Sequence, residues 1–278
     1  MSPTDFSHVE LPRLGNRVLR LGVGGNYGLQ TADIHRAAER GVNFWFYSAN
    51  MKKVTPALKE ILARDRERHV VAAIGLVAYT ARGVRKIVDR ARQTLGIDML
   101  DLYLLSWLGR TSRFSRAIQD TLVQLRDSGV VRAVGTSTHD RVRAGSLARD
   151  SILDALMIRY NAAHPGAEQD IFPHLKARNP LLISYTTTSW RQLLKPIKGI
   201  KMPPFPGEAS VPPLTPELCY RFVLSSPHVH VALTAPKTGA QLEQNIKSVE
   251  QGPLPADVDQ WVRQYGREVR ARKKLPFM

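Results

Sequence analysis

The sequence has few of the features that mark a secreted or membrane-bound protein. It contains one cysteine, Cys219, which excludes an internal disulfide and a thiolate metal cluster. Its longest apolar run, VVAAIGLVAY, is much shorter than the roughly 18 residues that a membrane helix needs. The opening MSPTDFSHVE lacks the charged segment and apolar core of a secretory signal. We therefore expect a cytoplasmic protein that does not associate with membranes.

Acidic residues are also scarce. Aspartate and glutamate number 24 against 40 lysines and arginines, which gives a net charge of +16. Such an excess would suit a nucleic-acid partner. Its densest part, VRQYGREVRARKK, has basic residues at helical spacing, but only Tyr265 interrupts them, whereas surfaces that bind single strands interleave aromatic side chains. We expect the solvated face of a last helix at about 254–274 and no nucleic-acid partner. The basic residues of this stripe are Arg263, Arg267, Arg270 and Lys274.

What the sequence does contain is a regular alternation of short β-branched runs and longer amphipathic segments. This alternation is typical of βα units around a parallel sheet, and no Ser/Gly-rich linker divides the 278 residues. We expect an α/β protein with one domain over 1–278, a single (β/α)8 barrel. A Pro-rich segment at about 201–214 is expected to be a loop insertion. The expected strands are 18–24, 43–48, 69–75, 100–107, 131–137, 155–161, 181–187 and 229–235.

Four segments carry a resemblance to a known family. ERGVNFWFYSA is similar to G-[IV]-N-F-F-D-T-A, and LGIDMLDLYLLSW is similar to LG-x-D-Y-L-D-L-Y-L-L-H-W. LVQLRDSGVVRAVGTST and LTAPKTGAQLEQN resemble two further motifs of the same set. All four are motifs of the aldo-keto reductase family, and the resemblance runs from about residue 11 to 250. It implies a barrel of aldo-keto reductase type.

The resemblance also implies where a reducing centre would lie, at the carboxyl ends of the strands. The family uses an Asp, a Tyr, a Lys and a His, and the Tyr gives a proton to a carbonyl oxygen as hydride arrives from the nicotinamide. In this chain the four positions hold Phe46, Met51, Ile74 and Ser106. None of the family residues is retained, so the catalytic residues of this chain stay unidentified. We expect weak or absent ordinary carbonyl reductase activity.

The replacements are mainly apolar, which suggests a pocket reshaped for other chemistry. Removing one partner of a buried ion pair costs about 3–5 kcal/mol, whereas replacing both by apolar groups can be neutral. We expect a substrate pocket formed by Tyr27, Phe46, Met51, Ile74, Ser106, Trp107 and His139. Candidates for a substitute acid or base are Tyr27, Lys52, Lys53, His139 and His164. No pair among them has metal-ligand spacing, so we expect no metal.

The cofactor side of the site is better retained. The resemblance implies that Tyr185 stacks on the nicotinamide and that Lys237 and Thr238 meet a 2′-phosphate, while Met157 stands where the family has a Gln. The implied cofactor-binding residues are Ser137, Thr138, Met157, Tyr185, Lys237, Thr238, Gln241, Gln244 and Asn245. The alternative is that KTGAQLEQN is an ordinary helix start with Thr238 as its N-cap. We expect NADP(H) to bind weakly, if at all.

Three functional interpretations follow. The first is an aldo-keto-reductase-like enzyme with an apolar site that acts on a small organic molecule by cyclisation, dehydration or isomerisation. The second is an NADP(H)-dependent oxidoreductase with a substitute proton donor. The third is a catalytically silent barrel that binds a nucleotide or a partner. The sequence names neither the substrate nor the oligomeric state.

Overall fold

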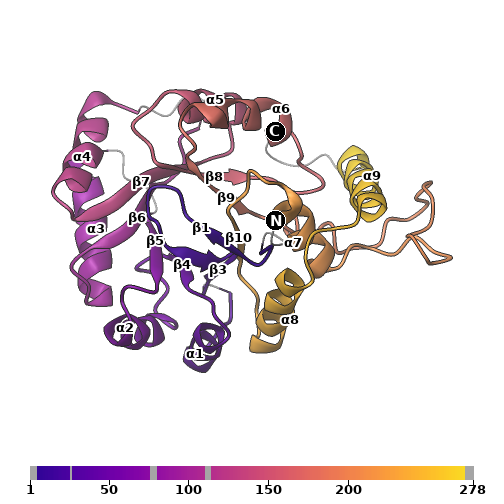
Figure 1. The fold of residues 1–278 in the computed structure, drawn as a ribbon, viewed down its shortest axis with the longest axis horizontal. Coiled ribbons are helices and arrows are strands. Elements are labelled where there is room, and N and C mark those ends of the chain that lie inside the picture. Colours follow the sequence, from indigo (N-terminus) through magenta and orange to yellow (C-terminus); the bar gives the residue numbers. More distant parts are fainter. Residues whose placement is uncertain (1–4, 26, 76–79, 110–113, 273–278) are drawn as a thin grey trace.

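A closed barrel of eight parallel strands forms the centre of the structure, a computed structural model that describes residues 5–25, 27–75, 80–109 and 114–272. Each strand pairs with the next one in chain order, and the last pairs with the first (Figure 1). The predicted (β/α)8 barrel is therefore confirmed. Its strands are β3 (Leu21–Gly24), β4 (Phe44–Tyr47), β5 (Val70–Ile74), β6 (Leu100–Leu105), β7 (Val131–Thr138), β8 (Ala155–Arg159), β9 (Leu181–Tyr185) and β10 (Val231–Thr234).

Helices surround the strands, as the ribbon in Figure 1 shows. Side-chain caps at Thr80, Ser115, Asp140, Thr215 and Thr238 accept a hydrogen bond from the first turn of the helix that follows each of them. The helices are α1 (Thr31–Glu39), α2 (Thr55–Arg64), α3 (Ala81–Leu95), α4 (Arg116–Asp127), α5 (Arg141–Arg149), α6 (Ala167–Asp170), the 3-10 helix η1 (Phe172–Ala177), α7 (Pro216–Ser225), α8 (Gly239–Glu250) and α9 (Ala256–Arg272).

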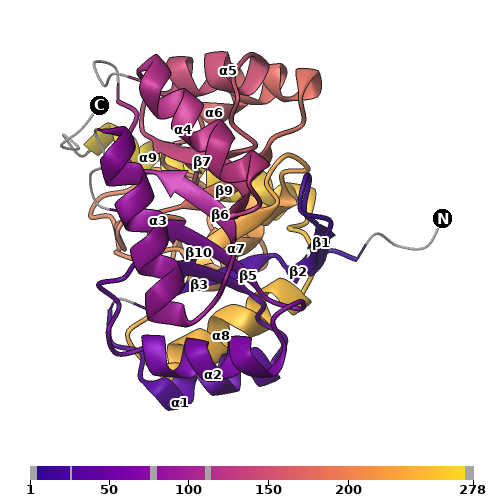
Figure 2. The same ribbon diagram turned by 90° about the vertical axis from the view of Figure 1, so that its left-hand side faces the viewer.

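The two ends of the barrel carry different elements. A hairpin of β1 (His8–Glu10) and β2 (Arg17–Leu19) lies at one end, and α9 lies toward the other (Figure 2). The sequence predicts one strand over 18–24, but Arg20 divides it into β2 and β3. The Arg20 side chain is buried and donates to the carbonyl oxygens of Leu224 (2.8 Å) and Val229 (2.7 Å). These hydrogen bonds hold the hairpin at the end of the barrel that lies away from α9 (Figure 2).

Successive side chains of β4 enter two different cores, because side chains alternate along a strand. Phe44 and Phe46 pack against the cluster inside the barrel. Trp45 and Tyr47 belong to the cluster between strands and helices, and the Tyr47 hydroxyl lies 3.3 Å from that of Thr55. Tyr47 therefore faces away from the barrel axis, as the alternation predicts.

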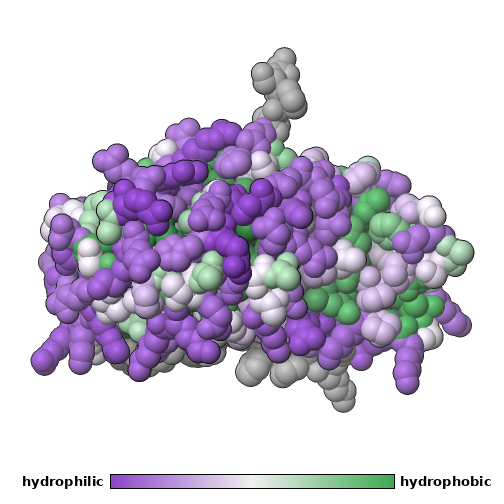
Figure 3. All heavy atoms as spheres, turned by 90° about the horizontal axis from the view of Figure 1, so that it is seen from below, coloured by the Kyte–Doolittle hydropathy of each residue, from purple (hydrophilic) through white to green (hydrophobic). Residues whose placement is uncertain are grey.

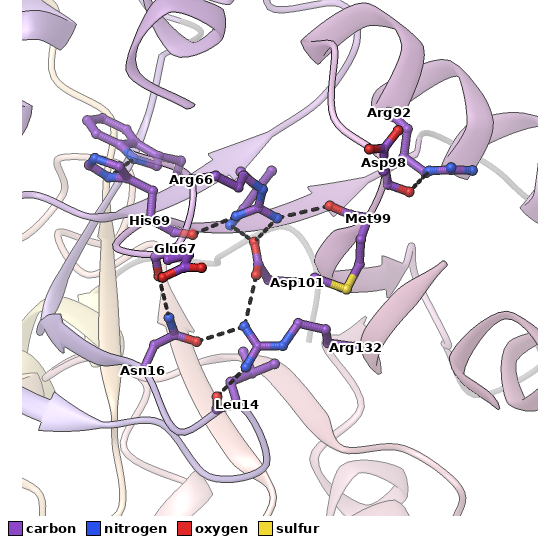
Figure 4. A network of polar contacts seen from close by, with 12 residues as sticks. Leu14, Asn16, Arg66, Glu67, His69, Arg92, Asp98, Met99, Asp101 and Arg132 are labelled. Carbon is purple, nitrogen blue, oxygen red and sulfur yellow. Dashed lines mark hydrogen bonds and ion pairs between the residues drawn. The ribbon is translucent and has the colours of Figure 1, made fainter. Parts of the chain in front are cut away.

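Asp101, at the start of β6, fastens several strands together (Figure 4). Its carboxylate is 1% exposed and lies 2.8 Å from Arg66 Nη2 and 3.2 Å from Arg132 Nη1. The backbone N–H of Val71 also donates to it at 2.8 Å. Arg132 donates in turn to Asn16 at 3.0 Å. The network ties β5, β6 and β7 to the segment between β1 and β2.

The Pro-rich segment 201–214 contains no helix or strand and packs against α9. Trp261 Nε1 donates to the Pro203 carbonyl at 2.9 Å, and its ring meets that of Phe205 at right angles. Tyr265 donates to the Lys195 carbonyl at 2.8 Å. These contacts bury the apolar face of α9.

The surface is mostly hydrophilic, as expected for a chain in which 23% of the residues are charged (Figure 3). Figure 3 shows a face on which hydrophilic atoms predominate, with hydrophobic atoms gathered toward its right-hand end. That end carries α9 and the segment that follows β9 in Figure 1. Within the described ranges, no helix is both long and apolar enough to cross a membrane.

Candidate active site

A cleft of about 680 Å³ runs from the mouth of the barrel outward to α8. Its inner end is formed by the carboxyl ends of the strands, and its outer walls are the segment that follows β9, the start of α7 and the start of α8. The carboxyl ends of the strands are where barrel enzymes place their chemistry. Nine of the residues predicted for the site line it, namely Tyr27, Phe46, Met51, Met157, Tyr185, Lys237, Gln241, Gln244 and Asn245.

The inner end of the cleft is largely apolar. Phe46 and Met51 line it, and neither can donate or accept a proton. Ile74 packs against the same interior cluster as Phe46, from the neighbouring strand β5. In the register of the two strands Phe46 lies opposite Ala72, so Ile74 is its diagonal neighbour. Phe46, Met51 and Ile74, which the sequence resemblance assigns to three of the four positions of the family's reducing centre, are hydrocarbon or thioether side chains, and that assignment stays a prediction.

A row of aromatic rings continues from Tyr185 across the mouth. The Tyr185 hydroxyl lies 2.8 Å from Nδ1 and 2.9 Å from Nε2 of His139. The His139 ring meets the Trp107 ring edge-on at 5.9 Å, and the Trp107 side chain is 68% exposed. Burial, with the charge of Arg159, lowers the pKa of His139 and thereby favours the neutral form of its imidazole. Burial also raises the pKa of Tyr185 well above its ordinary value.

Ser106, Ser137 and Thr138 lie at the carboxyl ends of β6 and β7. Ser106 is partly buried and has a polar partner. The Ser137 hydroxyl accepts a hydrogen bond from the backbone N–H of Trp107 at 3.1 Å. The Thr138 hydroxyl donates to the Leu108 carbonyl oxygen at 2.7 Å. The two hydroxyls therefore hold the segment after β6, and their role as cofactor contacts stays a prediction.

The segment after β9 carries polar atoms that lack partners. Thr186, Ser189, Trp190 and Arg191 all have positive φ angles, between 49° and 66°, which non-glycine residues rarely adopt. Asn161 stabilises this backbone by donating to the Thr186 carbonyl at 2.8 Å. The hydroxyls of Thr186, Thr187 and Ser189 are buried without a hydrogen-bond partner among the described residues. A ligand with acceptor oxygens would satisfy those that face the cleft.

The start of α8 forms the outer wall of the cleft. Thr238 caps the helix by accepting from the Gln241 N–H at 3.3 Å, as the helix-start interpretation predicts. Lys237 is exposed on the wall, and its backbone N–H donates to the Gln241 side chain at 3.0 Å. Asn245 donates to the Thr234 hydroxyl at 2.9 Å. The cap and a phosphate site are compatible, because a capped helix start still presents N–H groups to an anion.

Packing between the first loop and α8 brings Tyr27 to the cleft. Gly28 has φ +142°, and a Cβ atom there would lie 2.5 Å from the Lys237 carbonyl oxygen. Only glycine permits this approach. Tyr27 is 64% exposed and lines the cleft beside Lys237.

Two charged residues near the outer wall were missed by the sequence reasoning. Asp33 and Arg36 of α1 form an ion pair, and both contact the position that a side chain at Gly239 would occupy. Arg36 thus lies close to the start of α8, with its charge balanced by Asp33. The sequence alone shows Arg36 only as a basic residue in the helix that follows the first barrel strand.

The remaining candidates for a proton donor lie elsewhere. Lys52 and Lys53 are exposed. His164 is buried, lies 3.1 Å from the Asn161 side-chain oxygen and has its pKa lowered to about 4, chiefly by burial. In the part of the chain that the structure describes, no three His, Cys, Asp or Glu side chains are grouped so as to hold a metal ion.

The structure is a (β/α)8 barrel with a cleft at the carboxyl ends of its strands, the end at which enzymes of this fold place their active sites. A family profile described as "Aldo/keto reductase family" matches residues 26–198. The chain belongs to the aldo/keto reductase family, as its motifs implied. A comparison with curated proteins found no significant match.

Solved structures share the fold. An aldo-keto reductase from Bacillus halodurans in its holo form is 17% identical, with a TM-score of 0.77 over 93% of this chain and 96% of that one. An aldo/keto reductase from Klebsiella pneumoniae, solved in complex with NADP and acetate, is 18% identical, with a TM-score of 0.72 over 94% and 95% of the two chains. At these identities the likeness concerns the fold alone.

Proposed function

We propose that this chain is an aldo-keto-reductase-like enzyme that binds NADP(H) in the cleft and acts on a small organic molecule by chemistry other than ordinary carbonyl reduction. Cyclisation, dehydration and isomerisation are the reaction types that an apolar site favours. The observation that carries the proposal is that Phe46 and Met51 line the cleft. The sequence resemblance assigns these two positions to the family's Asp and Tyr. Neither Phe46 nor Met51 can supply the proton that carbonyl reduction needs.

The residues present fit a nicotinamide nucleotide at one end better than at the other. Thr186 and Thr187 line the cleft, and their buried hydroxyls, which have no hydrogen-bond partner among the described residues, are candidate contacts for phosphate oxygens. Lys237 suits a 2′-phosphate. Met157 also lines the cleft, but it offers no amide group to the nicotinamide carboxamide. NADPH supplies a hydride when it is bound, and this chain would hold its phosphates more firmly than its nicotinamide ring.

A second candidate is an NADP(H)-dependent oxidoreductase with a substitute proton donor. The hydrogen bond between Tyr185 and His139 at the mouth favours it, because a Tyr–His pair is able to pass a proton. Burial raises the pKa of Tyr185, which makes it a poorer acid than an unperturbed tyrosine. This is why we rank the second candidate below the first.

One titration and one assay test the proposal. NADPH is titrated into the protein while the fluorescence of the nucleotide and of the tryptophans, among which Trp190 lines the cleft, is followed. A panel of aldehydes and ketones is then assayed with NADPH. We expect saturable binding and turnover about 10²–10⁴-fold below that of a family member with the complete reducing centre, since a positioned acid is worth that much. Ordinary rates on simple aldehydes would favour the second candidate, and no binding would favour a silent barrel.

A further inference from the structure

Arg159 is the last residue of β8 and faces the mouth of the barrel. Ala155 and Met157 belong to the cluster inside the barrel, whereas Leu156 and Ile158 belong to the outer cluster. Alternation along the strand therefore directs Arg159 toward the barrel axis. Its register partner on β9 is Tyr185, which lines the cleft.

The guanidinium group of Arg159 forms no ion pair with any residue that the structure describes. Its Nη1 atom is buried and has no hydrogen-bond partner among residues 5–25, 27–75, 80–109 and 114–272. Burial lowers the pKa of Arg159, Tyr185 partly opposes this shift, and the charges of Arg141 and Arg270 lower the pKa further. Buried charges in proteins are normally paired, because desolvation of an unpaired charge is costly. The half-buried Arg159 side chain thus has one buried donor, Nη1, without an acceptor among the described residues.

Nearby carboxylates are already paired with other arginines. Asp170 lies 3.1 Å from Arg141, and Glu168 lies 2.6 Å from Arg263. Arg141 and Arg270 nevertheless act on Arg159 and on His164, since their charges lower both pKa values. The pKa of His164 falls to about 4, first by burial and then by the charges of Arg159, Arg270, Arg141 and His139.

Polar groups that would complete an anion site lie on the adjoining strand ends. The Tyr185 hydroxyl and the His139 ring are hydrogen-bonded to each other at the ends of β9 and β7. One of them can turn a proton toward a ligand oxygen held by Arg159. A guanidinium group presents two parallel N–H donors, a geometry that matches a carboxylate.

We propose that Arg159 anchors the carboxylate of an organic acid at the mouth of the barrel, with Tyr185 and His139 beside it. This deepens the proposed function, on which it rests, by naming the substrate class. The substrate would lay its apolar part against Phe46 and Met51 and its carboxylate against Arg159. The phosphates of the nucleotide are the other source of an anion, and the experiment separates the two.

The test compares phenylacetate with its neutral isostere phenylacetamide by isothermal titration calorimetry. We expect phenylacetate to bind at least tenfold more tightly. The difference in affinity between the acid and the amide should vanish in R159Q. It should survive in part in R159K, which keeps the positive charge but loses the two parallel N–H donors. R116Q is the matched control, because the Arg116 side chain is 89% exposed on α4 and should leave both affinities unchanged. Equal affinity for the acid and the amide in the unmodified protein would overturn the proposal.

Two further readouts distinguish the alternatives. R159Q should unfold at a higher temperature than the unmodified protein, because it removes a half-buried charge that has no counterion among the described residues. A lower unfolding temperature would show that Arg159 has a structural partner and would overturn the proposal. Displacement of phenylacetate by an equal concentration of inorganic phosphate would overturn the assignment to a carboxylate. NADPH affinity should be unchanged in R159Q. If phenylacetate binds but NADPH does not, the cofactor part of the proposed function fails while the carboxylate anchor stands.

Discussion

Lys237 and Asp101 show how differently two charged residues act in this barrel. Lys237 is exposed on the wall of a cleft, where its charge is available to a ligand. Asp101 is buried, and both of its oxygens are engaged by arginines from neighbouring elements. The first residue is expected to govern ligand selection and the second to govern stability.

We predict that Lys237→Ala abolishes a preference for NADP over NAD. A charge-assisted contact to the 2′-phosphate is worth about 1.5–3 kcal/mol, or roughly tenfold or more in affinity. The measurement is fluorescence titration with both nucleotides. Lys247→Ala is the control, because Lys247 lies on the same helix α8 and its side chain is also exposed. Equal affinity of the unmodified protein for both nucleotides would contradict the prediction.

We predict that Asp101→Asn destabilises the protein by about 3 kcal/mol, because it leaves Arg66 and Arg132 without their counter-charge. Urea denaturation measures the loss. Asp120→Asn serves as the control, since its ion pair with Arg116 is exposed and should contribute less than about 1 kcal/mol. Equal losses in the two variants would mean that Asp101 does not carry the network.

At the scale of elements, the strands β4 and β5 place Phe46 and Ile74 on the same interior surface. We predict that Ile74→Lys alone costs several kcal/mol, because it buries an unpaired cation. Adding Phe46→Asp should recover part of that loss, since a lysine is long enough to reach a diagonal neighbour. Thermal melts of the single and double variants measure the coupling. Strictly additive effects would show that the two side chains do not share a pocket.

The strands themselves were predictable, because short β-branched runs and their alternation are local features. The segment VLRLGVG was predicted as one strand, and Arg20 divides it into two. Arg20 is buried against the carbonyl oxygens of Leu224 and Val229, which lie far from it in the sequence. The site was less predictable. Arg159 was missed within ALMIRYN, although counting alternate residues from Met157 would have directed it inward. The hydroxyls of Thr186, Thr187 and Ser189, which have no hydrogen-bond partner among the described residues, could not be found from the sequence. Hydrogen-bond partners depend on how the chain folds.

At the scale of the whole molecule, buried histidines make stability depend on pH. His164 and His230 both have a pKa lowered to about 4, chiefly by burial. A folded pKa below the unfolded value of about 6.5 means that unfolding takes up protons as the pH falls. The stability they contribute is therefore complete above pH 6.5 and is lost progressively toward pH 4.

We predict a loss of up to about 3 kcal/mol for each of these two histidines between those pH values. Urea denaturation at a series of pH values measures the slope. A variant with His164→Asn and His230→Gln should show a shallower slope than the unmodified protein. NMR titration of the two rings with midpoints near pH 6.5 would contradict the prediction.

Closure of the barrel has a consequence for how the chain acquires its shape. β10 must pair with β3, its partner from the beginning of the chain, before the ring is complete. Until then β3 and β9 each present an unpaired edge, which is a hazard for association between unfinished chains. The cleft draws residues from Gly24 to Asn245, so it forms only after nearly the whole sequence has been synthesised. We therefore expect folding to be slow, as is usual when distant segments must meet, and ligand binding to appear last.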